Sequence, residues 1–379
     1  MLIRKLLEMA KRFSHKQILA CAFLALIFFV GAATFPSSMV NVVSLFQDEK
    51  ASTENTLLAA KVKIDDEYLN MLTFKGANFQ NKGTYINLNG FMARIMGQRY
   101  MNQVIKLKND HLSFIPGKHN VTLAATQLTK VCNRQKSKGK DFLFVLAPCQ
   151  VPKYQNILPA GYVDYSNPSS DELLELLRKN NVPVLDLREE MLNDNISYTD
   201  AFFKADHHWK PETGFYAYKK ILDYFIKKKI IEADNSKYTD IKEYNVETYK
   251  NWYLGSLGKR TGRYFTGVDD FSIITPKFET SMSAEIPSLS INKQGSFAEI
   301  GFDMSANKLD YFSANPYGVY GNKDRDFIRY RNASAPVNLK VLSWGDSFTN
   351  SSLTFLPLIF KKCDELDMRH YKGNFEEYY

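Results

Sequence analysis

Two short apolar runs separated by an amphipathic stretch constrain the fold of this 379-residue chain most strongly. The first run is DFLFVLAP at 141–148, and the second is VPVLDL at 182–187. Both are short and continuous, as expected for strands that are buried on both faces of a parallel sheet. Between them, SDELLELLRKNN at 170–181 has helical spacing and begins with a Ser that can cap a helix. Strand, helix and strand in this order predict a βαβ unit.

Further stretches extend this α/β pattern in both directions along the chain. A helix is expected at 123–137, and another from Pro211 to about 229, where apolar residues recur on one face. The segment NLKVLSWGDSFTNSSLTFLPLIFKK, at 338–362, predicts an apolar strand, a turn at Gly345 and then an apolar helix. The fold class is therefore α/β.

Two other regions indicate antiparallel structure. NQVIKLKNDHLSFI, at 102–115, predicts a hairpin with its turn at 109–110. The segment from about 236 to 336 is rich in Tyr, Phe, Thr and Ser and has few helical periods. Its runs FSIITP at 271–276 and SFAEIGFD at 296–303 predict strands of a separate antiparallel insertion.

The N-terminus has the pattern of a membrane anchor. A basic leader at 1–16 precedes the run ILACAFLALIFFVGAATF, which has no charge and is long enough to cross a hydrocarbon core of about 30 Å. Positive charge before the span favours a cytoplasmic leader. We therefore expect a single-pass signal anchor at 17–35, a connector at 36–75, and a main domain at 76–379 outside the cytoplasm at the cell membrane.

A cleaved signal peptide stays open as an alternative, because the small residues Gly31, Ala32 and Ala33 could form a processing site. The excess of 49 basic over 41 acidic residues gives a net charge of +8. Part of this excess lies in the leader, and no nucleic-acid-binding motif accompanies it, so a nucleic-acid partner is not expected.

The four cysteines constrain the structure little. Cys21 lies within the apolar run, which leaves Cys132, Cys149 and Cys363 outside it. An odd number allows at most one internal disulfide, and no pair has the spacing of a metal finger.

The strand-to-helix crossing VLSWGDSFTN is one of two places that could carry chemistry. Gly345 permits a tight turn, and Ser347 would stand at the start of the next helix. Free backbone N–H groups there can stabilise a developing oxyanion. A helix cap by Asp346 or Ser347 is the competing interpretation. The position directly after a core strand favours a functional site.

KADHHWKPETG, at 204–214, is the second such place, and three interpretations compete for it. Asp206, His207 and His208 could bind a metal, although no further ligand motif completes the coordination shell. Asp206 could instead cap the following helix while Trp209 packs in the core. In an extended segment, Asp206 and His208 would lie on the same side, so that the carboxylate orients an imidazole that activates Ser347.

DHHW at 206–209, followed downstream by a strand and GDS at 345–347, resembles the DHHW protein family and the related alginate O-acetyltransferases. These proteins have an SGNH-hydrolase-like fold in which the order of the motifs is circularly permuted, with Asp-x-His-Trp before the serine, as here. The resemblance covers roughly residues 76–379. It implies a three-layer α/β/α domain with a parallel sheet and a strand-rich insertion at about 236–336.

The same resemblance implies a role for each matched residue. Ser347 matches the nucleophile, His208 the general base and Asp206 the orienting carboxylate. LDMRHY at 366–371 and GSLGKRTG at 255–262 also resemble family segments. The further candidates for substrate or oxyanion binding are Gly345, Asp346, Arg369, Tyr371, Trp209 and Gly258. Relatives usually continue with another helix and core strand, so we expect either a longer chain or a sheet without an edge strand.

The function that this resemblance implies is an extracytoplasmic O-acetyltransferase. It would act on a cell-surface or exported polysaccharide through a serine acyl-enzyme, with a membrane-bound O-acyltransferase as the acetyl supplier and with no cofactor or metal. A carbohydrate acetylesterase and an inactive, membrane-anchored glycan-binding or assembly factor stay open. A metal-dependent phosphoesterase rests only on the letters Asp-His-His.

Overall fold

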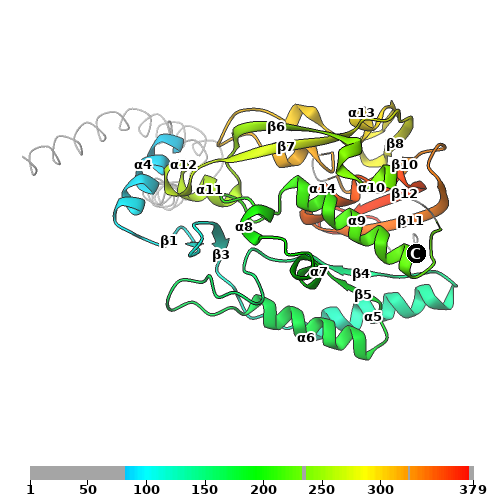
Figure 1. The fold of residues 1–379 in the computed structure, drawn as a ribbon, viewed down its shortest axis with the longest axis horizontal. Coiled ribbons are helices and arrows are strands. Elements are labelled where there is room, and N and C mark those ends of the chain that lie inside the picture. Colours follow the sequence, from blue (N-terminus) through cyan, green and yellow to red (C-terminus); the bar gives the residue numbers. More distant parts are fainter. Residues whose placement is uncertain (1–81, 233–235, 323–324, 375–379) are drawn as a thin grey trace, which may run out of the picture. The chain divides into compact units, whose positions relative to one another are not determined.

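The computed structural model describes residues 82–232, 236–322 and 325–374 (Figure 1). The predicted leader, anchor and connector therefore lie outside the described residues. Within the described part, no helix is long and apolar enough to cross a membrane. The chain divides into two compact units, Met1–Ile86 and Asn87–Tyr379, and the features below belong to the second.

The helices and strands follow a mixed order along the chain. The helices are α4 Lys82–Ile95, α5 Thr122–Ser137, α6 Ser166–Lys179, α7 Leu187–Asn193, α8 Tyr198–Ala201, α9 Pro211–Lys227, α10 Ser236–Thr239, α11 Ser256–Thr261, α12 Arg263–Thr266, α13 Phe297–Gly301 and α14 Asn350–Leu353. The strands are β1 Tyr100–Met101, β2 Val104–Lys106, β3 Leu112–Phe114, β4 Phe144–Leu146, β5 Val184–Asp186, β6 Tyr244–Tyr253, β7 Asp269–Pro276, β8 Met282–Ile286, β9 Ile291–Gly295, β10 Phe327–Arg331, β11 Val337–Gly345 and β12 Phe360–Asp367.

The predicted βαβ unit is present as β4, α6 and β5, with the two strands paired in parallel. Side chains alternate across this pair. Phe144 and Val184 pack with Cys132 of α5 and Leu177 of α6. On the other face, Leu185 packs in the main core that also holds residues of α7 and α9. Helices thus cover both faces of these strands, which is a local three-layer arrangement.

The predicted hairpin at 102–115 is also confirmed. Strands β2 and β3 pair antiparallel from Val104 opposite Phe114 to Lys106 opposite Leu112, and β1 extends them to a three-stranded sheet. Asp110 lies in the turn between them with φ of +66°. An Asp tolerates this left-handed conformation better than most residues.

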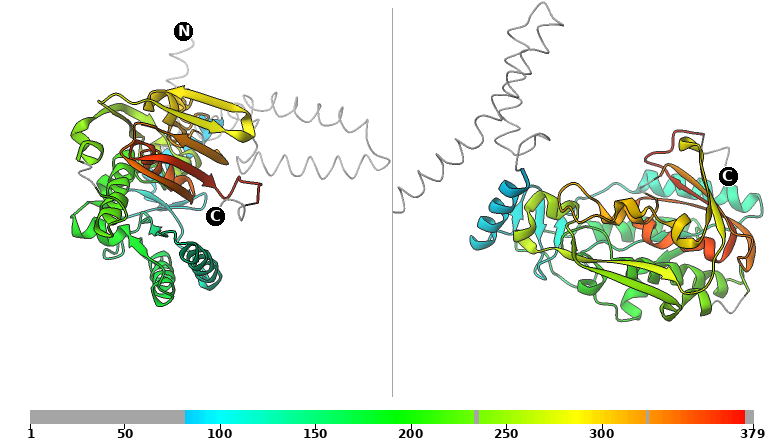
Figure 2. Two further views of the ribbon diagram at one scale, coloured as in Figure 1. Left: turned by 90° about the vertical axis from the view of Figure 1, so that its right-hand side faces the viewer. Right: turned by 90° about the horizontal axis from the view of Figure 1, so that it is seen from above.

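The expected separate insertion is wrong in one respect, because three of its strands, β8, β9 and β10, join the sheet that carries the serine motif. Strands β6 and β7 form a two-stranded sheet of their own. The five-stranded sheet has the order β11-β12-β10-β8-β9, in which β11 and β12 are parallel and the other pairs are antiparallel. The yellow, orange and red strands of this sheet lie side by side in the left view of Figure 2. Parallel pairing therefore occurs at β4–β5 and β11–β12, within a sheet arrangement that is mixed overall.

Two local predictions are corrected by the structure. SFAEIGFD forms helix α13 and no strand, because Ser296 and Glu299 make a reciprocal capping box at its start. The apolar helix expected after Gly345 is divided into short helical turns followed by strand β12. Pro357 is the second residue of the last of these turns, Leu356–Leu358, and no α-helix continues through it. FSIITP lies within β7, as expected, and β7 pairs antiparallel with β6.

Helix α9 positions the loop that precedes it. Pro211 begins the helix, and Phe215, Tyr218 and Leu222 are buried in the main core with Phe355. Figure 1 shows α9 beside α14, the short helix that follows the serine turn. The DHHW loop and the end of β11 are thereby brought to one place.

Candidate active site

Asp206, His208 and Ser347 form one continuous chain of hydrogen bonds. The Nε2 atom of His208 lies 2.8 Å from Ser347 Oγ, and its Nδ1 atom lies 2.5 Å from Asp206 Oδ1. Ser347 comes from the turn after β11, whereas the other two residues come from the loop before α9. Two segments that are 139 residues apart are thus joined in the geometry of an acid, a base and a nucleophile.

The Asp206 carboxylate is enclosed and fully hydrogen-bonded. Only 1% of Asp206 is exposed. Its Oδ1 accepts the backbone N–H of His208 at 3.0 Å, and its Oδ2 accepts that of Ser256 at 2.5 Å. Burial alone raises the pKa of this carboxyl, but the charge and hydrogen bonds of His208 outweigh it and hold the pKa well below its usual range. Asp206 is therefore ionised at neutral pH.

The loop that carries these residues is fixed by its backbone. Phe202 and Trp209 form an isolated antiparallel bridge, which closes the loop between them. The buried carboxylate of Asp269, on β7, accepts the N–H groups of Lys204 and Ala205 at 2.9 and 2.8 Å. Burial raises the pKa of Asp269 to about 6, although these two hydrogen bonds oppose the shift.

The segment GSLGKRTG supports Asp206 through its backbone. A Cβ atom on Gly255 would lie 2.1 Å from Asp206 Cβ, so only glycine allows this approach. The N–H of the predicted candidate Gly258 is bonded to the Ala205 carbonyl at 2.7 Å. Gly258 thus holds the loop and does not offer its amide to an oxyanion. Sequence reasoning singled out this segment but missed Gly255 and Ser256, which do contact Asp206.

His207 lies beside the relay and outside it. Its Nδ1 is 3.0 Å from Ser256 Oγ. Burial lowers the pKa of His207 to about 4, because the negative charge of Asp206 does not compensate for the lost solvation. The ligand atoms of Asp206, His207 and His208 do lie within 4.8 Å of one another. Each of the three residues already makes hydrogen bonds with such atoms, so a metal would have to displace the relay.

Aromatic rings surround the His208 imidazole. The Tyr317 ring stacks on it with centroids 4.3 Å apart and planes 19° apart, and Phe348 approaches it at 5.0 Å. The predicted aromatic Trp209 donates its indole N–H to Ser351 Oγ at 2.9 Å, which ties the loop to α14. Tyr317 and Ser351 were missed, because nothing in their local sequence distinguishes them from ordinary core residues.

The serine turn contains both a cap for its own backbone and a serine that faces the relay. The Asp346 carboxylate accepts the N–H of Phe348 at 2.9 Å and so caps the turn, while Ser347 faces His208. A Cβ on Gly345 would lie 2.4 Å from Thr349 Cγ2, so a side chain at this position would crowd the turn. Gly345 and Asp346 remain oxyanion candidates by their place next to Ser347.

The two site candidates that follow β12, Arg369 and Tyr371, bond to or pack against residues outside the relay. Arg369 forms a two-pronged ion pair with Asp367, with Nε 2.9 Å from Oδ1. The Tyr371 ring packs against Phe327 with centroids 6.0 Å apart. Asp367 in turn lines a small pocket of about 20 Å³ together with Gly345 and Asp346. Arg369 is thus bonded to one residue of a pocket that the serine turn also lines.

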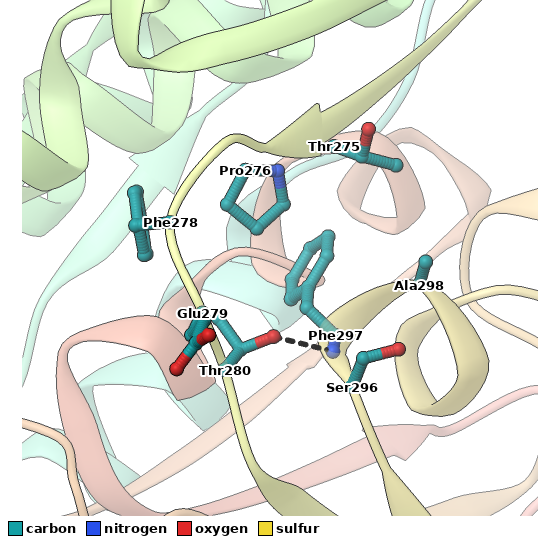
Figure 3. Close-up of a pocket in the computed structure, with 8 residues that line it drawn as sticks. All are labelled: Thr275, Pro276, Phe278, Glu279, Thr280, Ser296, Phe297 and Ala298. Carbon is teal, nitrogen blue, oxygen red and sulfur yellow. Dashed lines mark hydrogen bonds between the residues drawn. The ribbon is translucent and has the colours of Figure 1, made fainter.

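A larger cavity lies elsewhere on the domain. It has a volume of about 400 Å³ and lies between the end of β7 and the start of α13, where Figure 3 shows Phe278, Glu279 and Phe297 around it. The hydroxyl of Thr280 accepts the N–H of Phe297 at 2.8 Å. No residue of the relay lines this cavity, so it has no direct part in the chemistry proposed below.

Comparisons with known proteins show what the domain is similar to. Residues 111–258 match the family model of the SGNH hydrolase-like domain of the acetyltransferase AlgX. Bacillus cereus PatB1, in a structure with a sulfonyl adduct, superposes with a TM-score of 0.59 at 21% identity, over 73% of this chain and 90% of that one. A DHHW family protein from Eubacterium siraeum gives a TM-score of 0.53 at 17% identity, over 74% and 87% of the two chains.

No curated protein matches the chain at the sequence level. The matched range contains Asp206 and His208, whereas Ser347 lies outside it. The structural likeness extends beyond that range to most of the chain. The predicted resemblance is therefore confirmed: the chain has an SGNH-hydrolase-like α/β fold, and its residues 111–258 are similar to the acetyltransferase domain of AlgX.

Proposed function

We propose that this protein is an O-acetyltransferase that moves an acetyl group to a hydroxyl of a cell-surface or exported polysaccharide. The hydrogen-bonded relay from Asp206 through His208 to Ser347 carries the proposal. The match to an acetyltransferase domain supports the choice of acyl group. A relay of this kind activates a serine for acyl transfer on many unrelated folds.

In the first half-reaction, Ser347 Oγ attacks the carbonyl carbon of an acetyl donor. His208 Nε2 takes the hydroxyl proton as the new C–O bond forms, and the Asp206 carboxylate stabilises the resulting imidazolium. Collapse of the tetrahedral intermediate breaks the bond to the leaving group, which receives the proton from His208. Acetyl-Ser347 and the free leaving group are the products.

In the second half-reaction, a sugar hydroxyl replaces the donor. His208 removes its proton, the sugar oxygen attacks the acetyl carbonyl, and the bond to Ser347 Oγ breaks. The proton returns from His208 to the serine, which regenerates the free enzyme. With water in place of the sugar the same steps release acetate, so the relay also supports an esterase.

Mass spectrometry of the acylated chain tests the first half-reaction. Incubation of the full chain with an activated acetyl ester should place one acetyl group on Ser347, and a sulfonyl fluoride should block it by forming a sulfonyl ester. Ser347→Ala should lose both reactions. Ser343→Ala, on the strand β11 that precedes the serine turn, is the matched control and should keep them. Acetylation that persists in Ser347→Ala would refute the proposed nucleophile.

The ratio of transfer to hydrolysis separates the two enzyme activities. We expect acetylated oligosaccharide in excess of free acetate when both acceptors compete. Hydrolysis alone would identify a carbohydrate acetylesterase. An intact chain that binds glycan but never reacts with an ester would identify a glycan-binding or assembly factor.

The donor and the location belong to the same proposal. A basic leader followed by an uncharged apolar run supports a single-pass anchor, with the catalytic domain outside the cytoplasm. We propose that a membrane-bound O-acyltransferase supplies the acetyl group at that surface. Anchoring would hold Ser347 near both this supplier and the exported polymer.

A further inference from the structure

One face of helix α4 is packed against the domain. Ala93 is buried in a cluster with Leu257 of α11 and Phe265 of α12. Gly90 lies so close to the Thr261 carbonyl that any side chain at this position would collide with it. Figure 1 shows α4 beside α11 and α12. The small residues of α4 therefore serve its contact with these two helices.

The opposite face of α4 is apolar and exposed. Its five side chains are each between 46% and 65% exposed: Leu88, Phe91, Met92, Ile95 and Met96. Met96 continues the last turn, because its N–H donates to the Met92 carbonyl at 2.9 Å. The spacing i, i+3, i+4, i+7 and i+8 makes these residues one stripe along the helix, which we call the outer face. Single exposed apolar residues are ordinary, whereas a continuous stripe is typical of a surface that binds a partner.

Two exposed tyrosines accompany the outer face. The Tyr264 ring, on α12, meets the Phe91 ring edge to face, with centroids 6.4 Å apart. Tyr100 begins β1, four residues after Met96. A tyrosine combines an apolar ring with a polar hydroxyl, and it is therefore enriched where hydrocarbon meets water at the surface of a bilayer.

The charged residues near the outer face are all basic. Between Asn87 and Asn109 the sequence has no Asp or Glu and four basic residues: Arg94, Arg99, Lys106 and Lys108. The stretch 255–267, which forms α11 and α12, adds three more and again no acid: Lys259, Arg260 and Arg263. The two stretches are adjacent, since the N–H of Arg263 donates to Asn87 Oδ1 at 2.9 Å. An apolar helix face with basic residues beside it is typical of a helix that lies on an anionic bilayer.

The place of α4 in the chain also favours a bilayer as the partner. It is the first described element, and it follows the uncharged apolar run at 18–35, for which a membrane anchor is proposed above. Only residues 36–81 separate the two. Such a tether raises the effective concentration of α4 at the membrane surface, so that a weak interfacial affinity is enough to hold it there.

We propose that the outer face of α4 docks on the surface of an anionic bilayer, with Tyr100 and Tyr264 at the level of the headgroups. This inference goes beyond the acyl chemistry, and it rests on the proposed anchor for its choice of partner. Helix α11 gives the docking a consequence for the site. It packs against α4 at Thr261, and its Ser256 amide supports Asp206. Docking would therefore hold the relay in one orientation toward the membrane.

Quenching of a fluorescent label by lipid tests the docking in the full chain. Met92→Cys carries an environment-sensitive dye, and the vesicles contain phosphatidylcholine and phosphatidylglycerol with brominated acyl chains, which quench a dye that reaches the hydrocarbon. Leu123→Cys, at an exposed position of α5, is the matched control. Wild type treated with the dye gives the background of the native cysteines. We expect quenching about threefold or more stronger at position 92 than at position 123, and weaker in phosphatidylcholine alone.

A second experiment separates this docking from the anchor. Leu24→Arg with Phe28→Arg weakens the anchor, and that chain should keep a salt-sensitive affinity for vesicles with phosphatidylglycerol. Addition of Phe91→Glu and Ile95→Glu to that chain should lower this affinity about tenfold or more, because it removes the apolar contact.

Leu123→Glu with Leu192→Glu, which changes two exposed leucines on other helices, is the control and should leave the affinity unchanged. Equal quenching at positions 92 and 123 would overturn the proposal. A label at position 92 that neither brominated lipid nor aqueous iodide reaches would also overturn it, since a protein or another segment of this chain would then cover the outer face. Acylation of Ser347 by a small ester is measured separately, so its loss with normal quenching would refute the proposed function alone.

Discussion

The two adjacent histidines have opposite environments, and this difference decides their roles. His208 is held between Asp206 and Ser347, whereas His207 bonds only to the Ser256 hydroxyl and lies 3.6 Å from the Asp206 carboxylate. The two rings lie side by side, with centroids 3.9 Å apart, but it is the Nε2 atom of His208 that lies 2.8 Å from Ser347 Oγ. Only one imidazole of the pair can therefore reach the nucleophile.

The pH dependence of acylation should distinguish the two histidines. The pKa of His207 is about 4, so His207 stays neutral above roughly pH 5 and contributes no ionisation near neutrality. His207→Gln should leave the pH profile of Ser347 acylation by a small ester unshifted between about pH 5.5 and 8. His208→Gln should lower the rate by about 10²-fold to 10⁴-fold. A pH profile that shifts in His207→Gln would show that His207 titrates during acylation, which contradicts the assignment of His208 as the base.

The raised pKa of Asp269 predicts a pH dependence of the free energy of unfolding. The carboxyl of Asp269 has its pKa raised from 3.8 to about 6 in the folded chain, so the folded state binds more protons than the unfolded state between these values. Stability therefore falls as pH rises through this window. Wild type should lose up to about 3 kcal/mol relative to Asp269→Asn between pH 4 and pH 7, at about 1.4 kcal/mol per unit of pKa difference.

Urea unfolding of both proteins at several pH values measures this difference. Because other titrating groups are common to the two chains, their contributions cancel in the comparison. A difference in the free energy of unfolding that stays constant from pH 4 to pH 7 would contradict the raised pKa of Asp269.

The proximity of the three relay residues was the part of the site that the sequence predicted best. Asp206, His208 and Ser347 stand in short motifs whose residue types suffice to suggest the chemistry. Ser256 and Tyr317 were not predicted, because the first acts through a backbone amide and the second through the face of one of many aromatic rings. Their roles follow only from the way distant segments meet.

At the scale of elements, the α11 segment is the support on which the relay depends. Its first residues bring the Gly255 backbone against Asp206, and the Ser256 amide completes the carboxylate's hydrogen bonds. Gly255→Ala would place a Cβ 2.3 Å from Asp206 Oδ2. The carboxylate or α11 must then move, and displacement of a catalytic group by about 1 Å costs about 10²-fold in rate.

We therefore expect Gly255→Ala to lower Ser347 acylation about 100-fold and to destabilise the fold by about 1 to 3 kcal/mol. Stopped-flow acylation and urea unfolding measure the two effects. Gly117→Ala is the matched control, because its Cβ would come no closer than 3.9 Å to any neighbouring atom. Normal acylation in Gly255→Ala would mean that the close approach of the Gly255 backbone to Asp206 is not needed for the reaction of Ser347.

Two secondary-structure predictions were wrong, each for an identifiable reason. SFAEIGFD alternates in a way typical of a strand, but the capping box of Ser296 and Glu299 stabilises a helical turn instead. In the segment after Ser347, apolar residues are continuous enough to suggest a helix, yet Phe360–Asp367 pairs with both β10 and β11 as a central strand. Tertiary pairing decided between two local patterns that were nearly balanced.

At the scale of the whole domain, three strands of the strand-rich insertion, β8, β9 and β10, share one sheet with β11 and β12. Strand β10 pairs with β12, so residues from within the insertion lie beside the strand that follows the nucleophile. Such pairing links segments far apart in the chain, and no local period encodes it. The helices on either side of β4 and β5 were predicted well, because a βαβ unit is built from neighbours in sequence.

The last prediction concerns the attachment of the whole molecule to a membrane. We expect residues 18–35 to retain the chain in the membrane during alkaline extraction, with the catalytic domain open to protease from outside the cell. Leu24→Arg with Phe28→Arg should reduce this retention, since each arginine near the centre of a span costs about 2.5 to 3.5 kcal/mol. Leu24→Ile with Phe28→Leu is the control that keeps the hydrophobicity. A mature chain whose N-terminus begins just after Ala33 would show instead that the run is a cleaved signal peptide, and the relay would then act without an anchor of its own.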